Sequence, residues 1–179
     1  MFSDLGSFSM GYRATRNGVN GFVTAGHCVS GVGASVWGYS TDIGTTRARV
    51  YAGTDACFVE SVAEHTPSNV LVDSSNILST TISSPGVGTV INKAGKSTGY
   101  TSGTVTSTNV SVSYDGQNFN YLVAANYISA PGDSGGIVYS YISSTNTRYT
   151  LGIHVASNDT TRYYCKAMHV NDALGCTRY

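Results

Sequence analysis

The sequence predicts an all-β protein, and three observations support this fold class. The composition is rich in small and β-forming residues, with 21 glycines and 13 tyrosines, while only 11% of the 179 residues are charged. Short β-rich segments recur along the chain, and several alternate apolar with small polar residues. Turn sequences separate these segments. Strands spaced in this way are typical of antiparallel barrels or sandwiches.

The individual elements follow from these patterns. The strand pattern is clearest in residues 21–24, 89–91, 104–106, 110–114 and 136–139. Turn signals occur at Arg16-Asn17-Gly18, Ser83-Ser84-Pro85-Gly86, Tyr114-Asp115-Gly116 and Ser144-Thr145-Asn146. One helix is expected at about residues 170–174, where Asn171 or Asp172 could cap it. The chain has no linker or repeat.

The charge balance excludes several kinds of partner. Ten basic and ten acidic residues cancel, and no run of lysine or arginine occurs. Nucleic acids and anionic membranes both require a basic face, and a membrane span requires about 18 apolar residues. We therefore expect neither a nucleic acid nor a membrane as partner. The first residues show no leader pattern, so either the protein is not exported or a leader and any pro-segment have been trimmed; we expect trimming from a secreted protein.

Three short segments carry residues suited to nucleophilic catalysis. They are Phe22-Val23-Thr24-Ala25-Gly26-His27-Cys28, Thr54-Asp55-Ala56-Cys57-Phe58-Val59 and Ala130-Pro131-Gly132-Asp133-Ser134-Gly135-Gly136. A serine hydroxyl is a poor nucleophile unless a neutral imidazole takes its proton, and a buried carboxylate must orient that imidazole. The glycine-rich turn can also aim the N–H groups of Gly132 and Ser134 at one point, which is how an oxyanion hole is built.

These motifs resemble those of the chymotrypsin-fold serine endopeptidases, especially the short bacterial branch that includes α-lytic and Streptomyces proteases. The stretch from Lys93 to Val105 resembles the strand pair that precedes the serine in that branch. The resemblance implies two six-stranded antiparallel β-barrels, residues 1–84 and 85–179, with the site in the cleft between them. It implies His27 as the base, Asp55 as its orienting acid and Ser134 as the nucleophile. No cofactor or metal is expected, the substrate is a protein or peptide, and we expect a monomer.

Asp133 lies next to the nucleophile, and a carboxylate buried there requires a partner. Mammalian relatives pair it with a new amino terminus, but this chain lacks the Ile-Val-Gly-Gly start that would supply one. The bacterial branch uses a basic side chain, and Lys93 falls at the matching place. The resemblance therefore implies a structural Lys93–Asp133 pair. The alternative is that Lys93 is a solvated surface lysine.

The resemblance also locates the pocket for the substrate side chain before the scissile bond. It implies walls made by Ile128-Ser129-Ala130-Pro131 and by Gly152-Ile153-His154-Val155-Ala156-Ser157-Asn158. Ile128 replaces the aspartate that selects Lys or Arg. The Gly-Ile-His sequence is similar to that of glutamyl endopeptidases and picornaviral 3C-type proteases, in which the histidine contacts Glu or Gln. We therefore expect His154, Ser157, Ser129 and Ile128 to form a pocket for Glu or Gln.

Two departures from the family pattern leave a second type of pocket as an alternative prediction. Val155 stands where a serine usually hydrogen-bonds toward the catalytic aspartate, and Pro131 directly precedes Gly132 in place of a hydroxyl residue. An apolar or small-residue pocket is therefore the alternative, with His154 packed on tyrosines. A protease-fold binding module without catalysis is the competing function class. His65 and His169 carry no motif and are expected to be structural or solvated.

Four cysteines allow three full pairings. The usual family partners before His27 and before Ser134 are absent. Because His27 and Asp55 must touch, we expect a Cys28–Cys57 bridge, and a Cys165–Cys176 bridge would tie the C-terminal segment to the last strand. The alternative is four reduced thiols. An even cysteine count and a low charge favour export.

Overall fold

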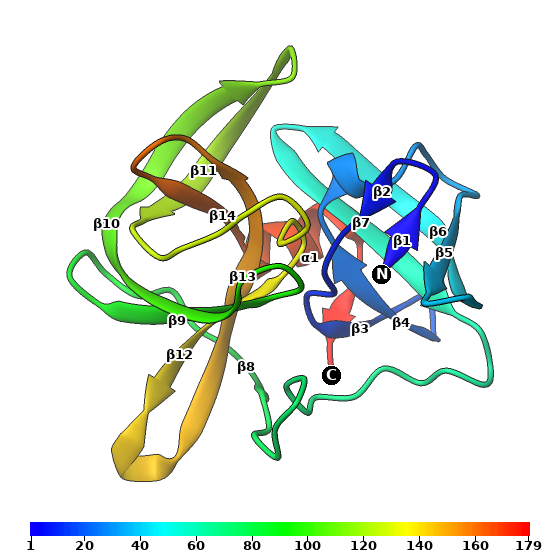
Figure 1. Cartoon of the computed structure of the whole chain (residues 1–179), viewed down its shortest axis with the longest axis horizontal. Coiled ribbons are helices and arrows are strands. Elements are labelled where there is room, and N and C mark those ends of the chain that lie inside the picture. Colours follow the sequence, from blue (N-terminus) through cyan, green and yellow to red (C-terminus); the bar gives the residue numbers. More distant parts are fainter.

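Fifteen β-strands, one α-helix and two short 3₁₀ turns make up the chain, and the computed structural model describes all residues from Met1 to Tyr179 (Figure 1). The strands form two sheets that lie next to each other. The first sheet contains β1 (Phe2–Ser3), β2 (Gly6–Ser7), β3 (Arg13–Arg16), β4 (Val19–Thr24), β5 (Ser35–Gly38), β6 (Thr41–Ala52), β7 (Thr54–Ser61) and β15 (Thr177–Arg178). The second contains β8 (Ser79–Ile82), β9 (Val90–Gly95), β10 (Gly99–Tyr114), β11 (Gln117–Ala125), β12 (Ile137–Ile142), β13 (Thr147–Ser157) and β14 (Arg162–Lys166).

The first sheet has eight strands in the order β15-β3-β4-β7-β6-β5-β1-β2. Its central strands are apolar because both of their faces are covered. In β4 and β7, Phe22 lies opposite Val59 and Thr24 lies opposite Cys57, and all four residues are buried. β4 and β7 also end or begin beside the segments that carry His27 and Asp55, so this antiparallel pair brings those segments together.

The second sheet closes into a ring. Its order is β12-β9-β10-β11-β14-β13-β8, and β12 also pairs with β13, so six strands surround a small core of eight buried residues. β8 adds to β13 in parallel outside this ring. A larger cluster of 27 buried residues includes Phe22 and Phe58 from the first sheet and Phe119, Ile153 and Val155 from the second. The two sheets therefore share a core.

The prediction of an all-β chain with one short C-terminal helix is confirmed. The helix, α1 (Ala167–Leu174), begins earlier than expected, so Asn171 lies inside it and does not cap it. Its N-cap residue, Lys166, makes no capping hydrogen bond through its side chain, and Gly175 ends the helix with φ +61°. None of the helices has the length and apolarity that crossing a membrane requires.

Two segments cross the expected division at residue 84. β8 precedes that position but pairs with β13 of the second sheet, where Tyr149 lies opposite Ser79. β15 is near the end of the chain but pairs with β3 of the first sheet, where Arg178 lies opposite Ala14. Each half of the molecule is therefore completed by a strand from the other half of the sequence.

Neither predicted disulfide is present, and the structure corrects this expectation. Cys28, Cys57, Cys165 and Cys176 are all free and buried. All four lie in the larger core cluster. Two of the thiols are hydrogen-bond donors to other side chains: Cys57 donates to Thr46 Oγ1 at 3.8 Å, and Cys176 donates to Asn171 Oδ1 at 3.5 Å. Closeness along the fold does not by itself give two cysteines the specific geometry of a disulfide bond.

Candidate active site

His27 and Asp55 form a hydrogen-bonded pair where the central strands β4 and β7 of the first sheet end and begin. His27 lies in a 3₁₀ turn (Gly26–Cys28) just after β4, and Asp55 lies near the start of β7. The imidazole Nδ1–H donates to Asp55 Oδ2 at 2.6 Å, and the His27 backbone N–H donates to Oδ1 at 2.9 Å. The Asp55 side chain is fully buried, whereas that of His27 is 27% exposed. The carboxylate thus holds Nδ1, and Nε2 is free to accept a proton from a group in the cleft.

Two opposing effects set the protonation of the imidazole. Burial is the largest single effect and lowers the pKa of His27, but the hydrogen bonds and charge interactions with Asp55 and Cys28 together outweigh burial. The pKa of His27 is therefore raised above its ordinary value. A base held in this way accepts a proton readily, and the carboxylate stabilises the imidazolium that results.

A third group, which the sequence patterns do not reveal, also contacts the carboxylate. The Tyr114 hydroxyl, from the end of β10 in the second sheet, donates to Asp55 Oδ2 at 2.7 Å. Tyr114 belongs to a turn signal, and nothing in that signal indicates a contact 59 residues away. The replacement of the usual serine by Val155 was the one indication that Asp55 would need another donor.

The Ser134 loop presents two free backbone donors. Gly132 adopts φ +99°, and a Cβ there would lie 2.4 Å from Ser97 Oγ, so this position requires glycine. The Asp133 N–H donates to Ala130 O at 3.0 Å, whereas the N–H groups of Gly132 and Ser134 make no hydrogen bond within the protein. These are the two donors that the sequence predicts for an oxyanion hole.

Contacts with the segment between β2 and β3 hold this loop in place. The Ser9 hydroxyl donates to Gly132 O at 2.8 Å, and the Ser9 N–H donates to Ser134 O at 2.8 Å. On the other side, the Gly135 N–H donates to His154 O at 2.8 Å. The serine is therefore anchored to both halves of the molecule.

Lys93 and Asp133 are brought together, and both side chains are fully buried. Lys93 Nζ donates to Asp133 Oδ2 at 3.0 Å, so Lys93 is not a solvated lysine. Burial alone would raise the pKa of the Asp133 carboxyl, but hydrogen bonds from Thr98, Lys93, Ser97 and Ala130 lower it to about 2. The carboxylate beside the nucleophile is thus charged and paired at neutral pH.

His27 and Ser134 lie on the walls of one cavity of about 180 Å³. Gly132 and Pro131 also line it, as do Leu5, Gly6, Ser7, Phe8 and Cys28. The imidazole and the Ser134 hydroxyl face this space without a direct hydrogen bond between them. Catalytic hydrogen bonds of this kind are often long in empty sites and tighten when substrate enters. The arrangement has the parts needed for acyl transfer.

Comparison with known proteins also indicates a hydrolase that works by acyl transfer. Glutamyl endopeptidase 2 from Streptomyces griseus is 33% identical over 168 residues, which are 90% of this chain and 84% of that protein. The chain belongs to the chymotrypsin-fold serine endopeptidases. The predicted family is thereby confirmed, and the matched relatives are named as proteases. No protein-family model matches the chain.

Two solved structures extend this comparison to the fold of this family member. Thermobifida fusca protease A superimposes with a TM-score of 0.83 at 21% identity, covering 99% of this chain and 93% of that one. A glutamic-acid-specific serine protease, described as using a histidine triad in substrate binding, gives a TM-score of 0.80 at 27% identity, covering 96% and 93%. The chain spans only 31% and 46% of the length of two longer curated relatives that it matches.

The predicted specificity residues of this serine endopeptidase family member lie behind and beside the Ser134 loop. His154 is buried on β13, and its ring Nδ1 contacts the Tyr127 hydroxyl at 2.8 Å. The Ser129 hydroxyl is buried and makes no hydrogen bond, whereas Ser157 and Ile128 are exposed. None of the four lines the cavity shared by His27 and Ser134.

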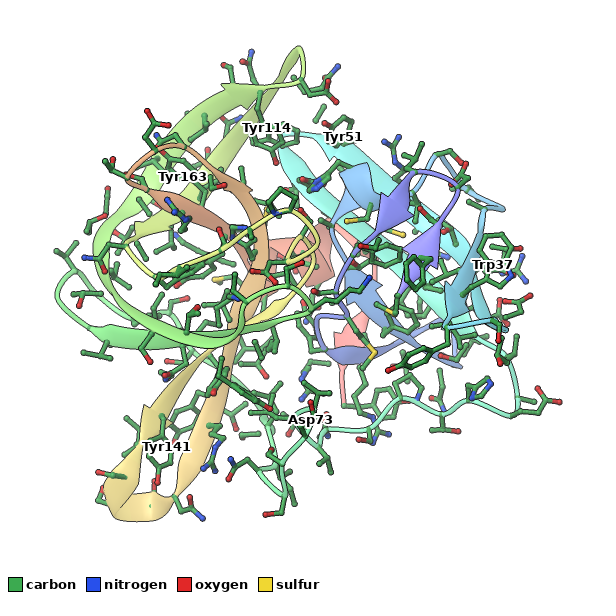
Figure 2. The ribbon with its side chains drawn as sticks, in the orientation of Figure 1. Trp37, Tyr51, Asp73, Tyr114, Tyr141 and Tyr163 are labelled. Atoms are coloured by element: carbon green, nitrogen blue, oxygen red, sulfur yellow. The ribbon has the colours of Figure 1, made fainter.

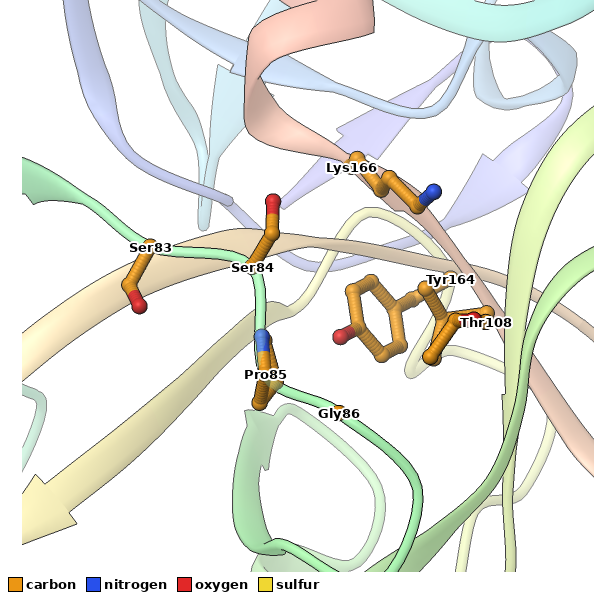
Figure 3. Close-up of a pocket in the computed structure, with 8 residues that line it drawn as sticks. Ser83, Ser84, Pro85, Gly86, Thr108, Tyr164 and Lys166 are labelled. Carbon is orange, nitrogen blue, oxygen red and sulfur yellow. The ribbon is translucent and has the colours of Figure 1, made fainter.

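A larger cavity of about 280 Å³ lies elsewhere on this family member, against the second sheet (Figure 3). Its walls include Ser84, Pro85, Tyr164 and Lys166, and no predicted catalytic residue lines it. The Tyr164 hydroxyl points toward Ser84 and Pro85 and has no hydrogen-bond partner (Figure 3). The size of a cavity therefore does not identify the catalytic centre in this chain.

Proposed function

We propose that the protein is a serine endopeptidase whose catalytic triad is His27, Asp55 and Ser134. Ser134 attacks the peptide carbonyl while His27 takes its proton, and the same imidazole then donates that proton to the leaving amine. The amine departs and leaves an acyl-enzyme, which water hydrolyses by the same route. The observation that carries the proposal is the hydrogen-bonded His27–Asp55 pair, with its carboxylate buried, on the same cavity as Ser134.

The two unpartnered N–H groups support the same reaction. The tetrahedral intermediate places a negative charge on the former carbonyl oxygen, and preorganised donors stabilise that charge. Gly132 and Ser134 supply such donors, and the buried Lys93–Asp133 pair anchors the residue between them. A binding module would have no need for free donors aimed at a cleft beside an oriented imidazole.

A fluorophosphonate probe tests this function. The wild-type protein is expected to be labelled at Ser134, and Ser134→Ala is expected to remain unlabelled at the same unfolding temperature. A folded wild-type protein that does not react with the probe would favour the protease-fold binding module.

The preference for Glu or Gln before the scissile bond is the second part of the proposal. Its structural support begins with a β-bulge at Val155: His154 lies opposite Tyr164, but Ala156 lies opposite Tyr163 and Ser157 opposite Arg162. The extra residue lets His154 and Ser157, three positions apart, share one face of the sheet. The unpartnered Ser129 hydroxyl supplies a further buried donor.

The tautomer of His154 follows from its partner. The Tyr127 hydroxyl makes no hydrogen bond other than the one to His154 Nδ1, so its proton goes to that nitrogen and the ring's own proton stays on Nε2. Burial lowers the pKa of His154 to about 3, so the imidazole is neutral at physiological pH. His154 thus offers one neutral N–H donor, which suits a carboxylate or an amide oxygen.

Relatives support this specificity, with one difference. The histidine triad belongs to the glutamic-acid-specific relative, whereas in this chain none of the other three histidines hydrogen-bonds to His154, whose ring partner is Tyr127. We test the proposal with peptides that differ only in Glu, Gln or Leu before the scissile bond. Glu and Gln peptides are expected to be cleaved at least tenfold faster than Leu, roughly the effect of one buried hydrogen bond. Equal rates would favour the apolar pocket.

Secretion remains a prediction. The low charge of the chain supports it. A disulfide bond would also have favoured secretion, but all four cysteines are free.

A further inference from the structure

The Asp55 carboxylate receives hydrogen bonds from both halves of the molecule. His27 supplies two of them from the first sheet, the backbone N–H to Oδ1 and the ring N–H to Oδ2. Tyr114 supplies the third from the second sheet, at 2.7 Å, and it reaches Oδ2, the oxygen that holds the imidazole. No other side-chain hydroxyl donates to Asp55, and Val155 of the second sheet has none to offer.

Tyr114 is a firm donor because its hydroxyl stays protonated. Burial and then the Asp55 charge raise the pKa of Tyr114 far above its ordinary value. Its ring stacks on that of Phe119, with centroids 4.1 Å apart and planes at 19°. Phe119 in turn packs against Tyr51 of β6 at 5.3 Å. The ring therefore cannot swing its hydroxyl away from the carboxylate without breaking this stack.

The backbone also fixes the end of the hairpin that carries Tyr114. The Gly53 N–H donates to Asn118 O at 2.8 Å, and the Asn120 N–H donates to Gly53 O at 2.8 Å. Gly53 lies only two residues before Asp55. The Tyr51 hydroxyl adds a bond to Asp115 Oδ2 at 2.7 Å, and Tyr51 and Tyr114 meet where the β10–β11 hairpin reaches the first sheet (Figure 2). We call this contact between the β10–β11 hairpin and residues 51–55 the hairpin clasp.

We propose that Tyr114 is a positioning residue for the catalytic base, holding Asp55 against His27 and dispersing the charge on its carboxylate. This inference rests on the proposed triad. Without the hydroxyl, Asp55 Oδ2 loses one of its two donors, and the charge that stays there stabilises the imidazolium more strongly. The base then remains protonated to higher pH, and the pair is less well oriented.

The other titratable groups near the pair are unchanged by the loss of one hydroxyl. They are Cys28 in the 3₁₀ turn, Cys57 and Arg49 in the first sheet, Tyr51 in the hairpin clasp, and Cys165 and His154 in the second sheet. A change of pH profile in Tyr114→Phe therefore reports on the Tyr114–Asp55 bond, because phenylalanine keeps the ring and its stack on Phe119.

Steady-state kinetics across the pH range test the inference. Tyr114→Phe is expected to lower kcat/KM about tenfold through kcat, with KM within twofold, and to move the acid limb of kcat/KM to higher pH. Tyr51→Phe is the matched control, because it removes a hydroxyl from the same clasp that does not touch Asp55. It is expected to leave the acid limb in place.

Two outcomes would overturn the role of Tyr114. One is a folded Tyr114→Phe with wild-type kcat/KM and an unmoved acid limb; the other is an equal shift in Tyr51→Phe, which would assign the effect to the clasp. The low-field proton resonance of the His27–Asp55 hydrogen bond gives a second readout, and it should shift only in Tyr114→Phe. A wild-type protein that resists the fluorophosphonate would instead refute the triad itself.

Discussion

Replacing Lys93 by methionine removes a buried ammonium and keeps an unbranched side chain of nearly the same length. Losing one partner of a buried ion pair costs about 3–5 kcal/mol. Asp133 keeps its donors from Ser97, Thr98 and Ala130, at 2.6–3.2 Å, so the lower end of that range is expected. For a chain of this size, ~3 kcal/mol corresponds to a fall in Tm of about 6–12 °C. Thermal unfolding followed by circular dichroism at pH 7 measures this change.

The pH dependence of the difference has a definite sign. Asp133 has a pKa lowered to about 2, so its pairing stabilises the wild-type protein above the ordinary carboxyl pKa and is lost as pH falls toward 2. In Lys93→Met the part of this contribution that comes from Lys93 is absent, whereas the donors Thr98, Ser97 and Ala130 remain, so the difference between the two unfolding temperatures should narrow as pH falls below 4. Because Asp133 lies between the two oxyanion donors, kcat should also fall, by up to about 10²-fold.

Two further variants decide whether the charge pair is responsible. Lys96→Met removes an exposed lysine three residues away, which packs over the Phe2 ring, and is expected to change stability by about 0.5 kcal/mol or less. Lys93→Met/Asp133→Asn removes both charges and should recover part of the lost stability. A Lys93→Met protein that melts within about 2 °C of the wild type, with unchanged kcat, would refute this reasoning.

Four further outcomes are expected. Ser134→Ala should lower kcat by about 10⁶-fold without changing the melting curve, and appreciable residual turnover would count against Ser134 as the nucleophile. Gly132→Ala should lower kcat by about 10²-fold with little change in KM, because a Cβ would lie 2.4 Å from Ser97 Oγ at φ +99°. Alkylation after unfolding without reductant should add four groups by mass spectrometry, and any smaller number would indicate a disulfide. The ratio of the cleavage rates of the Glu and Gln peptides should not change above pH 7, because the pKa of His154 is lowered to about 3. A ratio that decreases as pH rises would show that a charged imidazole binds the substrate.

Local motifs predict most of the catalytic centre. The segments around His27, Asp55 and Ser134 each form a single turn or strand whose shape depends on neighbouring residues. Their chemistry can therefore be predicted from the sequence. The Lys93–Asp133 pair could be expected because a buried carboxylate requires a partner. The long strand β10 was less predictable: residues 104–106 and 110–114 look like separate strands but lie in one strand interrupted by bulges.

Contacts between distant segments account for what the sequence does not reveal. Tyr114 reaches Asp55 only because the β10–β11 hairpin extends across to the first sheet, and a turn signal does not say where its hairpin points. The disulfide prediction failed for a related reason. Cys28 and Cys57 do share a cluster, but the rotamers that would join their sulfur atoms depend on packing that no motif encodes.

The pairing of β15 with β3 affects the order in which the parts of this molecule can fold. Arg178 lies opposite Ala14, so the edge of the first sheet closes only when residues separated by more than 160 positions meet. Contacts between such distant residues incur a large loop-closure entropy, which slows folding. On a ribosome, the half that carries His27 emerges first but lacks its edge strand until residues 177 and 178 have been synthesised. A nascent chain therefore cannot complete this sheet before residues 177 and 178 are available, although the segments that carry His27 and Asp55 are made much earlier.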